Sequence, residues 1–97
     1  MPNPGGRYEI KIGRDSSNDV AIPEETVSSL HATIEYQDGF FYLADQRSKN
    51  KTYLNGKKIV PYSPIKLKSG DEIMIHIHKF TFLLEQQTPS GDTDENW

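Results

Sequence analysis

The sequence predicts an all-β protein, a sandwich of two mainly antiparallel sheets. Hydrophobic and polar residues alternate over several short segments, which is typical of strands that face a core on one side and solvent on the other. Two dipeptides, Asp38-Gly39 and Asn55-Gly56, have the composition of tight hairpin turns. Other turn-forming clusters recur at short intervals, as they do in sandwiches of many short strands.

The alternation places the strands in chain order. The first strand carries the apolar residues Tyr8, Ile10 and Ile12. The first hairpin joins residues 32–37 to 40–45, and the second joins 52–54 to 57–59. The last two apolar rows consist of Ile73, Ile75 and Ile77, followed by Phe80, Phe82 and Leu84. Such rows are expected to face one core.

Residues 24–36 allow two interpretations. Pro23 and the two acids that follow it are typical of a helix start, and Val27, Leu30 and Ile34 have helical spacing. The β-branched and aromatic residues in the second half of the segment favour a strand. The hairpin turn that follows also needs a strand before it. We therefore expect a loop followed by a strand.

The chain of 97 residues is expected to hold one folded domain, over residues 7–85. Residues 1–6 contain two prolines and two glycines and are interpreted as a linker. Residues 86–97 are polar and acidic apart from Trp97, and they predict a disordered tail.

Charge and composition argue against several classes of protein. The net charge is −3, and three acids in residues 86–97 account for it, so the rest of the chain is neutral, unlike a nucleic-acid-binding protein. The absence of cysteine excludes disulfides and thiolate sites. No apolar run reaches the roughly 20 residues of a membrane span, and the first residues do not form a secretory signal. We expect a cytoplasmic protein that does not insert into membranes and is monomeric as an isolated domain.

Four short motifs, each in or beside a predicted loop, carry the candidate chemistry. They are Gly13-Arg14, Ser28-Ser29-Leu30-His31, Ser48-Lys49-Asn50-Lys51-Thr52 and Asn55-Gly56. Each alone is common by chance. In this order, followed by Gly70-Asp71 before a late strand, they resemble the forkhead-associated (FHA) family of phosphothreonine-reading β-sandwiches. The resemblance extends over about Tyr8–Leu84.

The resemblance implies a phosphothreonine-dependent peptide- or protein-binding module in signalling. Arg14 would hold the phosphate, because a guanidinium can donate two charge-assisted hydrogen bonds. Ser28 would donate its hydroxyl to the phosphate, and Ser29 would add its backbone N–H. Lys49 would lie beside the phosphothreonine, and Asn50 would bond the backbone of the peptide.

The resemblance assigns four further residues to the framework of the site. Gly13 would permit the tight turn that aims Arg14. His31 would tie the binding loops together without touching the ligand. Asn55 and Gly56 would form a structural turn.

Lys51 departs from the family pattern, because the residue after Asn50 is usually glycine. Either Asn50 or Lys51 would then adopt the unusual backbone angle of the turn, or the loop differs. A charged side chain there would reach the ligand, so Lys51 is a candidate peptide-binding residue. The departure leaves open an FHA-like structural interaction domain that has lost phosphate binding. The retained Arg14, Ser28 and Asn50 argue against that alternative.

The sequence predicts neither an enzyme nor a cofactor. It lacks a nucleophile pattern around His31, paired carboxylates and the Gly-rich loop of nucleotide enzymes. His76 and His78 alternate along one predicted strand, but two ligands are too few for a metal site. A basic stretch around Asn50 favours peptides with acids after the phosphothreonine. It comprises Arg47, Lys49, Lys51, Lys57 and Lys58.

Overall fold

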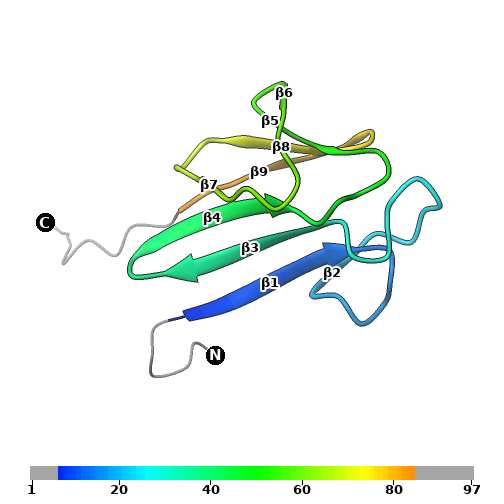
Figure 1. Ribbon diagram of the computed structural model, residues 1–97, viewed down its shortest axis with the longest axis horizontal. Coiled ribbons are helices and arrows are strands. Elements are labelled where there is room, and N and C mark those ends of the chain that lie inside the picture. The colour runs from blue at the N-terminus through cyan, green and yellow to red at the C-terminus, as the bar shows by residue number, and fades with distance from the viewer. Residues whose placement is uncertain (1–6, 85–97) are drawn as a thin grey trace, which may run out of the picture.

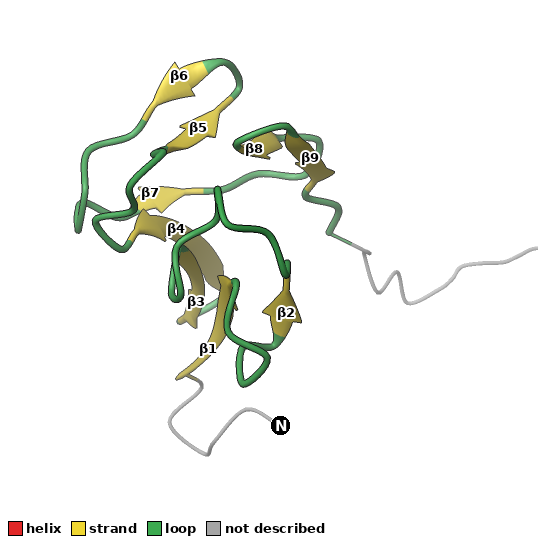
Figure 2. Cartoon of the chain, turned by 90° about the vertical axis from the view of Figure 1, so that its right-hand side faces the viewer, coloured by secondary structure: helices red, strands yellow, loops and turns green. Residues whose placement is uncertain are grey.

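The computed structural model describes residues 7–84 and confirms a sandwich of two sheets (Figure 1, Figure 2). One sheet contains β1 (Arg7–Gly13), β2 (Val20–Ala21), β3 (Ala32–Gln37), β4 (Phe40–Asp45) and β7 (Ile65–Lys66). The other contains β5 (Thr52–Leu54), β6 (Lys57–Lys58), β8 (Glu72–Ile75) and β9 (His78–Thr81). The predicted linker over 1–6 and tail over 86–97 lie outside the described residues.

The strand orders are β2-β1-β3-β4-β7 and β6-β5-β8-β9. All neighbouring strands are antiparallel except β1 and β2, which run parallel. The segment over 24–36 is a loop followed by β3, as expected, and residues 7–84 contain no helix. Val27 is fully buried while Leu30 is 38% exposed, so the helical spacing of these residues does not mark one buried face.

The two predicted hairpin turns are confirmed. Asp38 and Gly39 have φ angles of 52° and 90°, and Asn55 and Gly56 have 52° and 86°. Two successive positive φ angles define the turn whose twist matches that of the flanking strands, and Asp-Gly and Asn-Gly adopt it at least cost. The first turn joins β3 to β4 and the second joins β5 to β6.

The core lies between the two sheets and consists of aliphatic side chains from both. Its buried members are Ile12, Ile22, Val27, Ala32, Ile34, Leu43, Ile59, Leu67, Ile73 and Ile75. Two of them, Ile22 and Val27, belong to the segment between β2 and β3. Burial of these two side chains anchors that segment to the sandwich, so the loop that follows Val27 has a defined position.

The predicted alternation through Ile77 is wrong. Ile75 pairs with His78, so His76 and Ile77 form a two-residue turn between β8 and β9. His76 has a φ of 55°, and the side chain of Ile77 is 70% exposed. The left-handed conformation of His76 ends the strand before Ile77 can reach the core. His76 and His78 therefore do not share one face of a strand.

The Asn55-Gly56 turn is fastened to β8 by a polar clamp. Asn55 donates its side-chain amide to Asp71 at 3.0 Å and accepts the backbone N–H of Glu72 at 2.9 Å. Hydrogen bonds from the backbone N–H of Lys68 and from the Asn55 amide lower the pKa of the buried Asp71 carboxyl. The clamp holds the far end of the small sheet together.

Replacing Asn55 tests this clamp. We expect Asn55→Ala to lower the free energy of unfolding by about 2–4 kcal/mol, because it removes the amide bonds and strains a left-handed position. Asn55→Gly removes the same bonds without the strain, so it is expected to cost about 1–3 kcal/mol. Urea denaturation measures both. Unchanged stability in either variant would contradict the clamp.

Candidate functional site

Three loops meet at one end of the sandwich, on the right in Figure 1 and facing the viewer in Figure 2. The register of the large sheet brings them together. The end of β1 pairs with the start of β3 through Ile12 and Ala32, and the end of β4 pairs with the same residue through Asp45. The loops that follow β1, precede β3 and follow β4 must therefore be neighbours.

The first two loops are joined by backbone hydrogen bonds. The N–H of Arg14 donates to the carbonyl of Ser28 at 2.9 Å, and the N–H of His31 donates to Ile12 at 2.8 Å. Gly13 lies between these bonds and has no positive φ. A Cβ on Gly13 would collide with the carbonyl oxygen of Ser29. Glycine serves close packing here, and the chain turns toward Arg14 without a positive φ at Gly13.

The polar groups expected to face a phosphate gather at this junction. The guanidinium of Arg14 is exposed and donates from Nη2 to the Ser29 hydroxyl at 3.2 Å. The hydroxyl oxygen of Ser28 accepts the backbone N–H of Lys49 at 2.9 Å. Because that oxygen acts as acceptor, the hydroxyl hydrogen of Ser28 can still be donated to an anion.

Asn50 and Lys51 form the inner part of the third loop. Asn50 donates its side-chain amide to the carbonyl of Thr26 at 2.6 Å, which ties the third loop to the second. Lys51 has a φ of 67°, so it carries the turn angle itself. Its ammonium donates to the carbonyl of Ser48 at 3.4 Å, within its own loop.

His31 is fully buried and bridges the second and third loops. Its Nδ1 accepts the backbone N–H of Ser28 at 3.1 Å, and its Nε2 lies 2.9 Å from the carbonyl oxygen of Lys51. An N–H group can only donate, so Nδ1 is unprotonated and the ring hydrogen is on Nε2, where it is donated to Lys51. The imidazole thus fixes the distance between the two loops.

Asp45 shapes the third loop from below, and the sequence analysis did not single it out. Its buried carboxylate accepts the hydroxyls of Ser48 and Thr52, the latter at 2.6 Å, and the backbone N–H of Ser48 at 3.0 Å. Burial alone would raise the pKa of Asp45, but the hydrogen bonds from Ser48 and Thr52 together lower it. The spacing of Asp45 and Ser48 could have predicted this role, because an aspartate side chain in a turn often accepts a hydrogen bond from the backbone N–H of a residue that follows it closely in the chain.

Asn18 was also missed as a positioning residue. Its side-chain amide donates to the carbonyl of Ser29 at 2.6 Å and to that of Asp15 at 2.9 Å. It therefore holds the first loop against the second, next to Gly13. Nothing in the residue type alone distinguished this asparagine from an ordinary turn residue.

Residues 7–84 hold no cluster of three or more histidine, aspartate or glutamate side chains placed to bind a metal ion. They also contain no helix with the length and hydrophobicity required to cross a bilayer.

Comparison with known proteins identifies the family. The FHA domain model matches residues 10–76, so the chain belongs to the FHA family. It is 39% identical over 88 residues to chloroplastic zeaxanthin epoxidase from Prunus armeniaca, covering 86% of this chain and 13% of the enzyme. It is 34% identical over 87 residues to the oxoglutarate dehydrogenase inhibitor of Corynebacterium diphtheriae, covering 84% of this chain and 59% of the inhibitor. The chain thus spans less than two thirds of either relative.

A solved structure with a bound ligand shares the fold. The N-terminal FHA domain of Rad53p from S. cerevisiae, in complex with a phosphothreonine peptide, superimposes with a TM-score of 0.68 and is 32% identical. The match covers 72% of this chain and 57% of that chain. That FHA domain thus binds the class of ligand that the resemblance implied.

His31→Ala tests the bridge between the loops. We expect the free energy of unfolding to fall by about 1–3 kcal/mol, because the Ser28 N–H and the Lys51 carbonyl lose their buried partner. Leu30→Ala, at an exposed neighbouring position, serves as the control. Wild-type unfolding together with lost ligand binding would instead make His31 a ligand contact.

Asp45 is expected to make stability depend on acid pH. Its pKa is lower in the fold than in the unfolded chain, so its contribution is complete above about pH 4 and is lost as the pH falls through the folded value. Asp45→Asn should cost about 1–3 kcal/mol at pH 7 and flatten the acid side of the profile. The exposed Asp38→Asn is the control. An acid profile identical in Asp45→Asn and wild type would contradict this assignment.

Proposed function

We propose that this FHA domain binds phosphothreonine-containing proteins through the three loops at the end of the sandwich. The observation that supports this best is that the three loops are bonded to one another at this end of the sandwich (Figure 1). The Arg14 guanidinium donates to the Ser29 hydroxyl, and the backbone N–H of Lys49 donates to the Ser28 hydroxyl. A guanidinium, a hydroxyl with a free hydrogen and an ammonium side chain are donors suited to a dianionic phosphate.

Each candidate has a defined part in this proposal. Arg14 holds the phosphate, and Ser28 donates its hydroxyl to it, while Ser29 positions the guanidinium and offers its own N–H. Lys49 is exposed and lies beside the phosphothreonine. Asn50 is held by Thr26 and is placed to bond the peptide backbone.

The backbone of Lys51 weakens the alternative of an FHA-like domain that has lost phosphate binding. That alternative depended on the missing glycine after Asn50. Lys51 adopts the φ of 67° that glycine would supply, so the loop keeps its turn. The ammonium of Lys51 is bonded within the loop, and the preference for acids after the phosphothreonine therefore belongs mainly to Lys49.

We further propose that the protein is a non-enzymatic signalling module of the cytoplasm, monomeric by itself. The inhibitor relative supports a regulatory role, and the 13% coverage of zeaxanthin epoxidase is too small to imply its chemistry. The neutral folded part of the chain supports a protein ligand, with neither nucleic acid nor membrane as partner.

Calorimetric titration with matched phosphothreonine, phosphoserine and unphosphorylated peptides tests the function. We expect binding of the phosphothreonine form, about fourfold weaker binding of phosphoserine through the lost methyl contact, and none without phosphate. Arg14→Ala should weaken binding at least about tenfold, since a hydrogen bond to a charged group contributes about 1.5–3 kcal/mol. Arg14→Lys keeps the charge but loses the fork and should also bind more weakly.

The thermal midpoint of both Arg14 variants should match wild type, because the guanidinium is exposed. Equal affinity for phosphorylated and unphosphorylated peptides, or unchanged affinity in Arg14→Ala, would refute the proposed function.

A further inference from the structure

The outer face of the small sheet is hollowed by a cavity of about 420 Å³. This face points away from the core and does not belong to the three loops. The cavity is lined by Tyr53, Gly56, Glu72, Met74, His76 and Lys79. Two of these side chains, Tyr53 and Met74, are half-buried although they lie on the solvent side of the sheet.

A cross-strand row forms the floor of this hollow. Tyr53 pairs with Lys58 on one side and with Met74 on the other, and Met74 pairs with Lys79. Directly paired residues of antiparallel strands point to the same face, so the row runs lysine, tyrosine, methionine, lysine across β6, β5, β8 and β9. Ile73 and Ile75, the neighbours of Met74, point to the core. We call this row the Tyr53–Met74 row.

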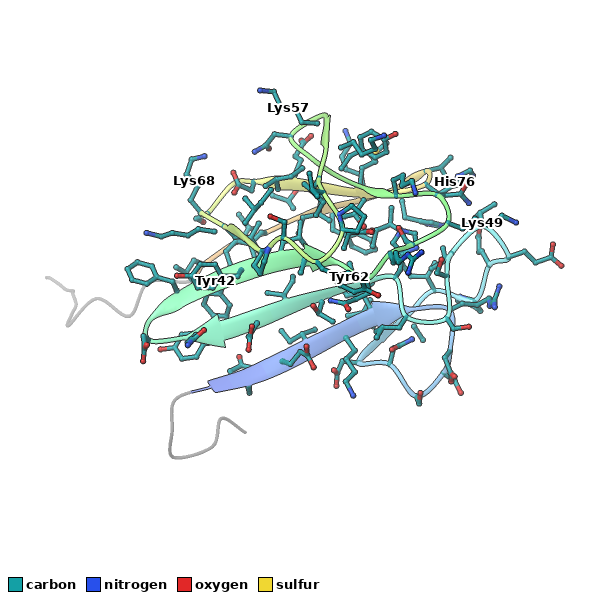
Figure 3. The ribbon with its side chains drawn as sticks, in the orientation of Figure 1. Tyr42, Lys49, Lys57, Tyr62, Lys68 and His76 are labelled. Atoms are coloured by element: carbon teal, nitrogen blue, oxygen red, sulfur yellow. The ribbon has the colours of Figure 1, made fainter. Side chains whose placement is uncertain are left out.

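The hollow begins beside the three loops of the candidate site. Thr52 pairs with Ile75, so the chain leading back to Asn50 and the turn at His76 leave the sheet at the same end. His76 and Lys49 lie at that end in Figure 3. Tyr53 is three residues beyond Asn50, about 10 Å away along an extended chain. A peptide held at Asn50 therefore reaches the hollow within a few residues.

The hairpin that carries His76 is also linked to the loop before β3. The imidazole Nε2 of His78 lies 3.3 Å from a carboxylate oxygen of Glu24. Thr26, two residues after Glu24, accepts the amide of Asn50. These contacts hold the β8–β9 hairpin, and with it one end of the hollow, against the loop before β3.

We propose that the Tyr53–Met74 row is a second docking site, for an apolar segment flanked by acids in the same partner protein that carries the phosphothreonine. This inference rests on the proposed function. The two central side chains offer an apolar surface for one or two hydrophobic residues, and the flanking lysines offer ion pairs to acids on either side. Glu72 lines the end of the hollow away from the loops, two residues before Met74 on β8. Its carboxylate repels acids of the partner, so those acids must lie on the side of Glu72 that is nearer the phosphothreonine.

Three phosphopeptides separate the contribution of the row from that of the loops. The first is a short phosphothreonine peptide. The second extends it, after a brief Gly-Ser spacer, with Asp-Leu-Phe-Asp, and the third extends it with Gly and Ser alone. Calorimetry with wild type is expected to show about tenfold tighter binding of the second than of the third, from one buried apolar anchor and exposed ion pairs.

Two variants remove the row and a third serves as the matched control. Lys79→Glu reverses one flanking charge, and Met74→Thr removes part of the apolar floor while keeping a residue suited to strands. Lys66→Glu makes the same charge change on β7, in the other sheet. The first two should reduce the gain from the extension to less than about twofold, and Lys66→Glu should retain it. All three should bind the short peptide like wild type.

The outcomes are distinguishable. Failure of wild type to bind the short phosphopeptide would overturn the proposed function, and this inference with it. Normal binding of the short peptide with no gain from the Asp-Leu-Phe-Asp extension would overturn this inference alone. A gain that survives in both Lys79→Glu and Met74→Thr would also overturn it. A wild-type dimer in sedimentation that Lys79→Glu dissociates would assign the row to a second copy of the chain and overturn it too.

Discussion

The two hydrogen bonds of the buried His31 ring are the constraint on which the binding end of this domain depends. Both ring nitrogens are committed to backbone groups, one in the loop before β3 and the other in the loop before β5. Neither bond can be exchanged for water, because the ring is fully buried. The exposed donors of both loops are therefore positioned by a group that is itself buried. The buried groups that position the loops are thus different from the exposed polar groups, which can stay hydrated when no ligand is bound.

Asp45 supports the same arrangement from the core side. A buried carboxylate is stable only when its oxygens are satisfied, and here hydroxyl and backbone donors of the third loop satisfy them. The loop before β5 is thus held by two buried side chains, the ring of His31 and the negatively charged carboxylate of Asp45. Close backbone packing completes the junction, since the absent Cβ of Gly13 leaves room for the carbonyl of Ser29. Buried polar groups fix the positions of the loops in this domain, and the aliphatic core between the sheets forms the rigid scaffold that carries those loops.

The small sheet has a second face that the binding loops do not use. Its inner residues, Ile73 and Ile75, complete the core, and the residues between them and beyond them point outward. The apolar pair Tyr53 and Met74, with a lysine at each side, is unusual here, because the solvent-facing positions of an antiparallel sheet are commonly polar. This face begins next to the third loop, so the docking site proposed above would divide affinity for a partner between the phosphate and the sequence around it.

The sequence by itself determined the sandwich and both Asp-Gly and Asn-Gly turns, because these follow from strand periodicity and turn chemistry. Its ordered motifs predicted which residues face a phosphate, and those roles stay predictions. It did not determine which of Asn50 and Lys51 carries the left-handed angle, since both residue types are allowed at some cost and only the closed loop selects Lys51. The alternation of apolar residues in the sequence predicted a strand that continues through Ile77, but Ile75 pairs with His78 and the strand ends at Ile75. The parts played by Asp45, Asn18 and the Tyr53–Met74 row belong to the tertiary structure. They arise from contacts between residues distant in the chain, and no local pattern of residue types encodes such contacts.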